Sequence, residues 1–158
     1  MNKKISFIII CLFLYSCGFQ PMFQNMDLSK LNINKINYTG KNEINYLIKN
    51  YLNIEEKKNN SGFIVNLFSS ESTSSSLKNT SGITTEESIN VKVLISVVDS
   101  KNNKILSENF EESKKILLTN NISSDQENRR ILIDKITKDI ARKIKFKLQL
   151  ISRSNLSQ

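Results

Sequence analysis

The chain has 158 residues and carries 23 lysines and arginines against 15 aspartates and glutamates, for a formal net charge of +8. This length suits one domain with a single core, and the basic balance favours anionic partners such as lipid headgroups, glycolipid phosphates or nucleic acid. There is no histidine, so the chain lacks the usual general base and the commonest metal ligand. An AT-rich genome would also make lysine abundant, and this alternative weakens conclusions drawn from the charge alone.

The N-terminal segment has the pattern of a secretory signal peptide. Two lysines precede the apolar run 5–15, and the small Ser16 stands before Cys17. The run is shorter than the roughly 20 apolar residues that a spanning helix needs. Leu14-Tyr15-Ser16-Cys17 resembles a bacterial lipobox, in which a thiolate, the reactive form of cysteine, takes the lipid. We predict a signal peptide over residues 1–16 and lipidation of Cys17; the alternative is a plain signal peptide that contains a cysteine.

One strand and one helix are predicted in the first part of the domain. Leu31 and Ile33 alternate with asparagines, the period of a half-buried strand, whereas Ile36 and Tyr38 are out of phase with them. This change predicts a bulge near Lys35. The next apolar positions have the spacing of an amphipathic helix; they are Ile44, Leu47, Ile48, Tyr51 and Leu52.

Three strands are predicted next. One begins at Phe63 and enters the serine-rich tract 69–76, which is either a loop or a strand extension whose short side chains face solvent. We expect a mixture, with pairing that decays past Ser72. The clearest strand signal is a run in which every second residue is β-branched; these residues are Ile89, Val91, Val93, Ile95 and Val97. A turn-rich cluster at 99–104 predicts a hairpin loop. The return strand, 105–115, is weaker, with inward-facing residues Leu106 and Phe110.

The last predicted element is a long helix. Residues 124–127, Ser-Asp-Gln-Glu, fit a capping box at its start. Apolar residues then recur at steps of three and four; they are Leu132, Ile133, Ile136, Ile140, Ile144, Leu148 and Ile151. A free basic helix lying on a membrane is the alternative. Because the apolar face of the strands must be buried, we expect the helix to pack on the sheet, with Ile140 over Val93 and Ile95.

The order of elements defines the fold class. We predict an α+β fold, a two-layer sandwich in β-α-β-β-β-α order, whose four-stranded and mostly antiparallel sheet is covered on one face by two helices. This single domain occupies residues 31–151. A lipidated lead over residues 17–30 precedes it, and residues 152–158, which have no pattern, are predicted to be a disordered tail.

Catalysis is not expected. The sequence has no Gly-rich phosphate loop and no Gly-x-Ser-x-Gly turn, and export would remove Cys11 and leave Cys17 as the acylated anchor, without a disulfide partner. The acidic pairs 86–87 and 111–112 are adjacent residues on strands, so their carboxylates point to opposite faces. We therefore predict neither an enzyme nor a cofactor.

The start of the predicted mature chain, Cys17-Gly18-Phe19-Gln20-Pro21, resembles that of the LPS-assembly lipoproteins (LptE-like) in their alphaproteobacterial form. The order of elements is also similar along the mature chain, although the serine-rich tract and the scarcity of arginine depart from many members. The resemblance implies an outer-membrane lipoprotein that plugs a β-barrel lipopolysaccharide translocon (LptD-like), helps it assemble and contacts lipopolysaccharide. A generic envelope lipoprotein that binds another protein or peptidoglycan is the alternative.

The resemblance also directs attention to particular residues. Gly18 beside the lipidated cysteine is what the general sorting rule associates with the outer membrane. Lipid A carries phosphates, and lysines at one end of the sandwich suit them as point charges. Candidates are Lys78, between the second and third strands, and Lys114 and Lys115, before the last helix; ordinary solvated lysines are the alternative. Nucleic acid is not an expected partner, because aromatic residues are lacking among the basic ones.

Overall fold

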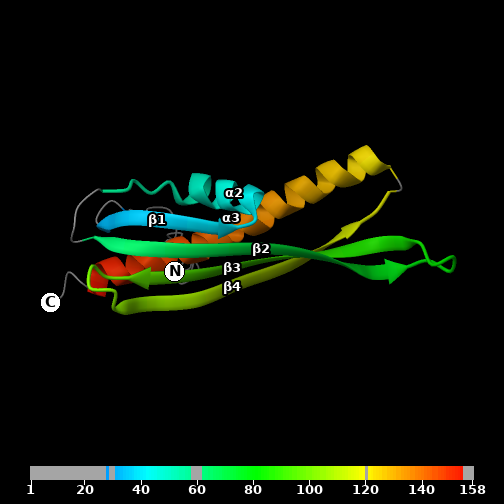
Figure 1. Ribbon diagram of the computed structural model, residues 1–158. Coiled ribbons are helices and arrows are strands. Elements are labelled where there is room, and N and C mark those ends of the chain that lie inside the picture. Colours follow the sequence, from blue (N-terminus) through cyan, green and yellow to red (C-terminus); the bar gives the residue numbers. More distant parts are fainter. Residues whose placement is uncertain (1–27, 29–30, 58–61, 120, 155–158) are drawn as a thin grey trace, which may run out of the picture.

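Six elements follow one another in the predicted order. A computed structural model of the chain describes residues 28, 31–57, 62–119 and 121–154 (Figure 1). The predicted signal peptide and Cys17 lie outside these residues. The elements are β1 (Ile33–Gly40), α2 (Asn42–Leu52), β2 (Phe63–Lys78), β3 (Thr84–Val98), β4 (Lys104–Leu117) and α3 (Ile122–Ser154).

The four strands form one mixed sheet with the order β1-β2-β3-β4. β1 runs parallel to β2, because the α2 crossover returns the chain to the same end of the sheet, and the other pairs are antiparallel. The register of β1 shifts between Ile33 and Lys35, which confirms the predicted bulge. Both helices lie on one face of the sheet (Figure 1), so the predicted two-layer α+β fold is confirmed.

The core lies between the sheet and the helices. All five predicted inward residues of β3, Ile89 to Val97, are at most 1% exposed, and Ile140 of α3 is fully buried in the same cluster. The α3 side chains that join them are Ile133, Ile136, Ile140, Ala141, Ile144, Leu148 and Ile151. The long helix therefore packs on the sheet, as predicted, and is not a free amphipathic helix.

The serine-rich tract is a strand along its whole length, and the predicted decay of pairing past Ser72 is wrong. β2 pairs with β3 as far as Lys78, which lies opposite Thr84, with an irregularity after Ser75. Ladder hydrogen bonds come from the backbone, and short hydroxyl side chains do not disturb them. Ser75 Oγ and Thr84 Oγ1, 3.1 Å apart, add a side-chain bond. The resulting ribbon extends beyond α2 (Figure 1).

The start of α3 also differs from the prediction. The helix begins at Ile122, and the backbone N–H of Ser124 donates to Asn121 Oδ1 at 3.2 Å. Asn121 is thus the N-cap, a position that asparagine favours, and Ser124 lies in the first turn. Asp125 Oδ1 accepts hydrogen bonds from both the N–H and the hydroxyl of Thr119 at 2.8 Å. The capping box predicted at 124–127 is therefore wrong, because the N-cap of the helix lies three residues earlier, at Asn121.

The far end of α3 continues past the predicted domain boundary at Ile151 to Ser154, and Ser152 is buried. Over its 33 residues the helix carries charges throughout. No helix in the part of the chain that the structure describes is both long enough and apolar enough to cross a membrane.

Candidate functional site

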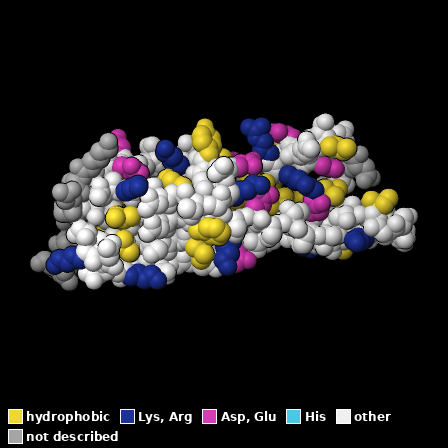
Figure 2. All heavy atoms as spheres, in the orientation of Figure 1, with side chains coloured by type: hydrophobic (Ala, Val, Ile, Leu, Met, Phe, Trp, Pro, Cys, Tyr) yellow, Lys and Arg dark blue, Asp and Glu magenta, His cyan; other side chains and the backbone are white. Residues whose placement is uncertain are grey.

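None of the helices and strands that the structure describes covers the face of the sheet opposite α2 and α3. In Figure 1 α3 passes behind the strands, so that this face is towards the viewer. We define the open sheet face as the outward positions of β2 from Ile64 to Ser74 and of β3 from Ser88 to Val98, with the β4 residues across from them. Lys92 is the only charged residue among the β2 and β3 positions. In the space-filling view the surface is largely white, the colour of backbone and of uncharged polar side chains, with separate yellow patches and scattered dark blue and magenta ones (Figure 2).

An apolar pair stands in the middle of the open sheet face. Phe68 of β2 lies opposite Leu94 of β3, and the two are 44% and 40% exposed. The neighbouring positions are polar: Asn66 lies opposite Ser96 on one side of the pair, and Ser70 lies opposite Lys92 on the other. Asn37 Nδ2 of β1 donates to Asn66 Oδ1 at 2.8 Å, so that the polar side chains bond to one another across the strands. The arrangement is an apolar centre in a polar surround that includes Lys92 and, across from it, Glu111 of β4.

Charged side chains concentrate instead along the seam where α3 passes β4. Lys114 Nζ lies 3.0 Å from Asp139 Oδ2, and Lys147 Nζ lies 2.6 Å from Glu108 Oε1. A third pair joins Lys143 of α3 to Glu112 of β4. The bond from Lys114 holds the pKa of the Asp139 carboxyl below its usual value. The seam closes one side of the sandwich and leaves these charges little freedom to bind other groups.

The structure separates the three lysines that the sequence singled out, and all three lie within strands rather than loops. Lys114 and Lys115 are adjacent in β4: Lys114 pairs with α3, and Lys115 Nζ pairs with Glu86 Oε1 of β3 at 2.9 Å. A hydrogen bond from Ser76 and the pairing with Lys115 lower the pKa of Glu86. Lys78 is exposed at the end of β2. The three therefore do not form one anion site.

A cationic strip on the solvent side of α3 was not singled out from the sequence. It comprises Lys135, Lys138 and Arg142, all exposed and spaced by three and four residues. Lys138 Nζ lies 5.8 Å from the centre of the Tyr51 ring of α2. The Tyr51 hydroxyl donates to Asp134 Oδ1 at 2.5 Å, and this bond is the main reason that the pKa of Tyr51 rises to about 12. The helical spacing of the basic residues is the signal that could have found the strip.

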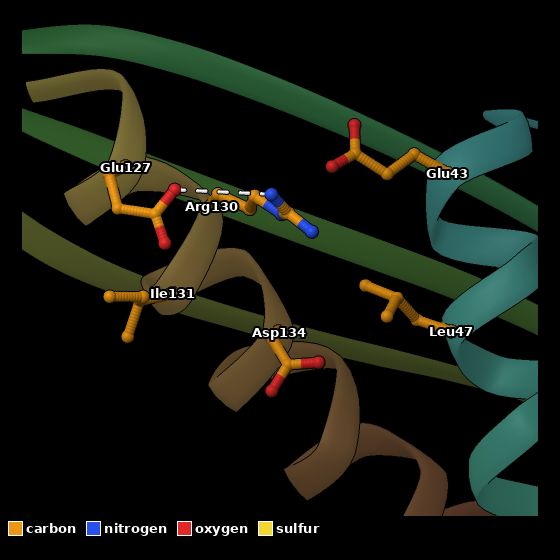
Figure 3. A pocket seen from close by; sticks show the side chains of 6 residues that line it. All are labelled: Glu43, Leu47, Glu127, Arg130, Ile131 and Asp134. Atoms are coloured by element: carbon orange, nitrogen blue, oxygen red, sulfur yellow. Dashed lines mark ion pairs between the residues drawn. The ribbon is translucent and has the colours of Figure 1, made fainter. Parts of the chain in front are cut away.

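A hollow of about 290 Å³ lies between α2 and the first half of α3. Glu43 and Leu47 point from α2 towards α3, and Arg130 and Asp134 point back towards α2 (Figure 3). Arg130 is 4.0 Å from Glu127, one helical turn away. The lining residues are Glu43, Leu47, Glu127, Arg130, Ile131 and Asp134. Within the described ranges no cluster of histidine, cysteine, aspartate and glutamate could hold a metal ion.

Comparison with known proteins identifies the fold. No family model matches the chain, and no curated protein matches its sequence. Solved structures do match: rare lipoprotein B from Shewanella oneidensis has a TM-score of 0.58 at 14% identity, covering 79% of this chain and all of that one. Lipoprotein B from Nitrosomonas europaea, described as uncharacterized, has a TM-score of 0.61 at 13% identity, covering 89% of this chain and 96% of its own.

A third structure, a candidate lipoprotein from Caulobacter crescentus CB15, has a TM-score of 0.55 at 11% identity, and the match covers 76% of this chain and 91% of that one. At identities of 11–14% these likenesses establish the fold. The chain therefore has the α+β fold of small bacterial proteins that are named as lipoproteins.

Proposed function

We propose that this protein is an outer-membrane lipoprotein of lipopolysaccharide assembly, which plugs a β-barrel translocon (LptD-like), helps it assemble and contacts lipopolysaccharide. The observation that carries the proposal is a coincidence of two independent features. The segment Leu14–Cys17 resembles a lipobox, and the domain behind it has the fold of solved proteins named as lipoproteins. The start Cys17-Gly18-Phe19-Gln20-Pro21 supports the particular family.

The proposed role is one of binding and scaffolding, without catalysis or a cofactor. The carboxylates of the α3–β4 seam are held by lysines at 2.5–3.0 Å, and such pairing suits a structural role better than proton transfer. The anchored domain would act through its surfaces at the periplasmic side of the outer membrane or in the barrel lumen.

Contact with lipopolysaccharide phosphates requires cations that are free to bind. Lys114 and Lys115 would have to exchange their carboxylate partners for phosphate, whereas Lys78 has no ion pair among the described residues and is exposed. Lys135 and Lys138 on α3 are also exposed. Of the three lysines predicted from sequence, Lys78 is therefore the strongest candidate for a phosphate contact.

Depletion in the native host, combined with copurification, tests the proposed function. Loss of the protein should leave the barrel misassembled and lipopolysaccharide missing from the cell surface. An LptD-like barrel should copurify with the wild-type protein from detergent-solubilised envelopes and be identified by mass spectrometry. Absence of the barrel would contradict the proposal, and recovery of peptidoglycan or of another envelope protein in its place would favour a generic binding lipoprotein.

A further inference from the structure

The positive charge of the chain is concentrated in one half of one helix. Residues 135–154 of α3 contain seven lysines and arginines and one aspartate, a net charge of +6 in a chain whose formal net charge is +8. The first part of the same helix, 122–134, contains two arginines and three acidic residues. An AT-rich genome would raise the number of lysines throughout the chain, but it would not remove acidic residues from one segment. The charge is therefore a local property of this helix half.

Only part of this charge is paired within the domain. Lys143 and Lys147 form ion pairs with carboxylates of β4. The cationic strip lies on the solvent side of the helix, and among the described residues Arg142 alone of its members has an ion pair, at 3.3 Å to Asp139. That carboxylate is already bonded to Lys114 of β4. The strip therefore keeps most of its charge available to an outside partner.

The helix itself does not account for the cationic strip. Like charges spaced by three and four residues repel one another and weaken a helix. The helix dipole favours cations only in the last turn, and the strip ends twelve residues before Ser154. Asp134, one residue ahead of the strip, accepts a hydrogen bond from Tyr51 at 2.5 Å. An anionic surface outside the domain is a partner that would offset this repulsion.

We propose that the cationic strip binds the phosphate headgroups of the lipid leaflet in which the chain is anchored, so that the C-terminal half of α3 lies along the membrane surface. This inference goes beyond the proposed function and rests on its lipid anchor, not on its barrel. Residues 135–154 span about 30 Å and run to the end of the molecule where β1 begins (Figure 1). The stretch from Cys17 to Leu28, just ahead of β1, reaches at most about 40 Å. The leaflet is therefore within reach of this helix half.

The contact is electrostatic and involves no insertion. The sheet covers the apolar side of α3, where Ile136, Ile140 and Ile144 are fully buried, so only the charged side is free to meet a membrane. Each lysine or arginine near an anionic leaflet strengthens binding about fivefold, and salt screens the attraction. Lipopolysaccharide phosphates offer the same chemistry, so vesicles that contain no lipopolysaccharide distinguish the two sources.

Energy transfer in vesicles tests the inference with the full-length lipidated protein. Ile131→Cys is the labelling site, because residue 131 is 58% exposed and lies one turn before the strip. It would be the only free thiol, since Cys11 leaves with the predicted signal peptide and Cys17 is acylated. The acceptor dye is carried by lipid headgroups. Transfer should be high in vesicles that contain phosphatidylglycerol, and it should fall in pure phosphatidylcholine or in about 1 M salt.

Neutralising the strip should release the helix from the surface. The variant combines Lys135→Gln, Lys138→Gln and Arg142→Gln. At about fivefold for each charge, the ratio of surface-bound to lifted protein should fall about a hundredfold. Transfer in phosphatidylglycerol vesicles should then drop to the value seen in pure phosphatidylcholine, because the tether allows an unbound domain to stand away from the surface.

A matched variant separates the strip from net charge. It combines Lys78→Gln, Lys101→Gln and Lys104→Gln, which remove three exposed lysines on the strands and their turns. This control loses the same charge and should keep the high transfer. Thermal unfolding of both variants should stay close to wild type, because the replaced side chains are exposed. If the strip variant unfolds, the salt and lipid dependence of the wild-type protein decides.

The outcomes separate the inference from the proposed function. Equal transfer in the two kinds of vesicle, or in wild type and the folded strip variant, would show the inference wrong and leave the proposed function standing. Release by inorganic phosphate that exceeds release by chloride at the same ionic strength would also contradict it, because that result indicates a discrete phosphate site. If the wild-type protein stays with neither kind of vesicle, the anchor is wrong, and the proposed function and the inference fail together.

Discussion

At the scale of single residues, the turn between β1 and α2 depends on Gly40 and a buried polar cluster. Gly40 has φ +92°, and the N–H of Lys41 beside it donates to Ser69 O of β2 at 3.0 Å. Ser69 Oγ lies 2.7 Å from Asn45 Oδ1, and Asn45 Nδ2 donates to Thr39 O. Ser69 and Asn45 are buried, and these bonds satisfy polar groups that would otherwise be costly. The cluster fixes how α2 leaves β1.

We predict that Gly40→Ala strongly destabilises the domain. A Cβ there would lie 2.0 Å from the Ser69 carbonyl oxygen, and the positive φ adds its own strain. The left-handed backbone costs about 1–2 kcal/mol and the displaced strand about as much again, for a total of about 3 kcal/mol. Urea denaturation of the chain without residues 1–17 measures the loss.

Gly82→Ala is the control for this prediction. Gly82 also has a positive φ, +79°, but a Cβ there meets nothing within 4 Å. It should cost only the backbone contribution of about 1–2 kcal/mol. Equal losses for the two variants would show that the contact with Ser69 is unimportant.

At the scale of elements, the two edge strands are protected in different ways. The outer edge of β1 is covered by the segment after α2, because Ile36 N donates to Glu56 Oε1 at 3.0 Å and Lys57 N donates to Ile33 O at 2.7 Å. Burial, with the charge of Glu56 nearby, raises the pKa of Tyr38 to about 12.

The other edge strand, β4, instead carries charged residues along its length, a common protection for an edge strand. Several of these residues form ion pairs with α3.

The α3–β4 seam predicts an acid-sensitive contribution to stability. Lys114 lowers the pKa of Asp139 below 3.8 in the folded protein, so the contribution is present above the unfolded pKa and is lost as the pH falls through the folded one. Because both side chains are 30% exposed, Asp139→Asn should cost less than about 1 kcal/mol at pH 7. The difference from wild type should therefore be smaller at pH 3 than at pH 7.

Urea denaturation of both proteins at pH 7 and pH 3 checks this expectation. Glu127→Gln on the same helix is a suitable control, because Glu127 is 62% exposed and 4.0 Å from Arg130. It should change stability by no more than a few tenths of a kcal/mol. A cost of Asp139→Asn that is the same at both pH values would mean that the ion pair is not its source.

At the scale of the whole molecule, the tether and the surfaces define how the domain meets its surroundings. Leu28 and Leu31 are buried beside the start of β1, with Leu31 N donating to Leu28 O at 2.9 Å. The predicted anchor at Cys17 precedes Leu28 by a short stretch that spans at most about 40 Å when fully extended. A lipidated domain would therefore stay close to the membrane.

We predict that Cys17→Ala abolishes lipidation without affecting the folded domain. Cys17 is the only residue that the lipobox-like segment places to take lipid, and stable membrane attachment needs more than one acyl chain. Cleavage of the signal peptide should stop as well. Metabolic labelling with a fatty-acid probe measures the loss of lipid, and thermal unfolding should be unchanged. Cys11→Ala is the control and should keep the label, since Cys11 lies within the predicted signal peptide. Label retained by Cys17→Ala would show that the anchor lies elsewhere.

The sequence by itself determined the order of the elements, the buried face of β3 and the apolar stripe of α3. These features follow from local periodicity, because residues such as Val93 and Ile140 alternate or recur at intervals that one strand or one helix turns towards a single core. The resemblance to the LPS-assembly lipoproteins likewise rests on a short local segment, Cys17-Gly18-Phe19-Gln20-Pro21. The full extent of β2 was not predictable in this way, because its serines have no apolar period and their pairing with β3 is made through the backbone.

Only the tertiary structure decided which charged side chains form ion pairs and which face of the sheet the helices leave open. Lys114 meets Asp139 and Lys147 meets Glu108 across 25 and 39 residues of sequence, and no spacing along the chain records such distant pairings. The pairing of Phe68 with Leu94 likewise depends on the register between two strands, and their exposure depends on which face the helices cover. Ion pairs and surfaces depend on how elements pack together, whereas local periodicity specifies only the elements.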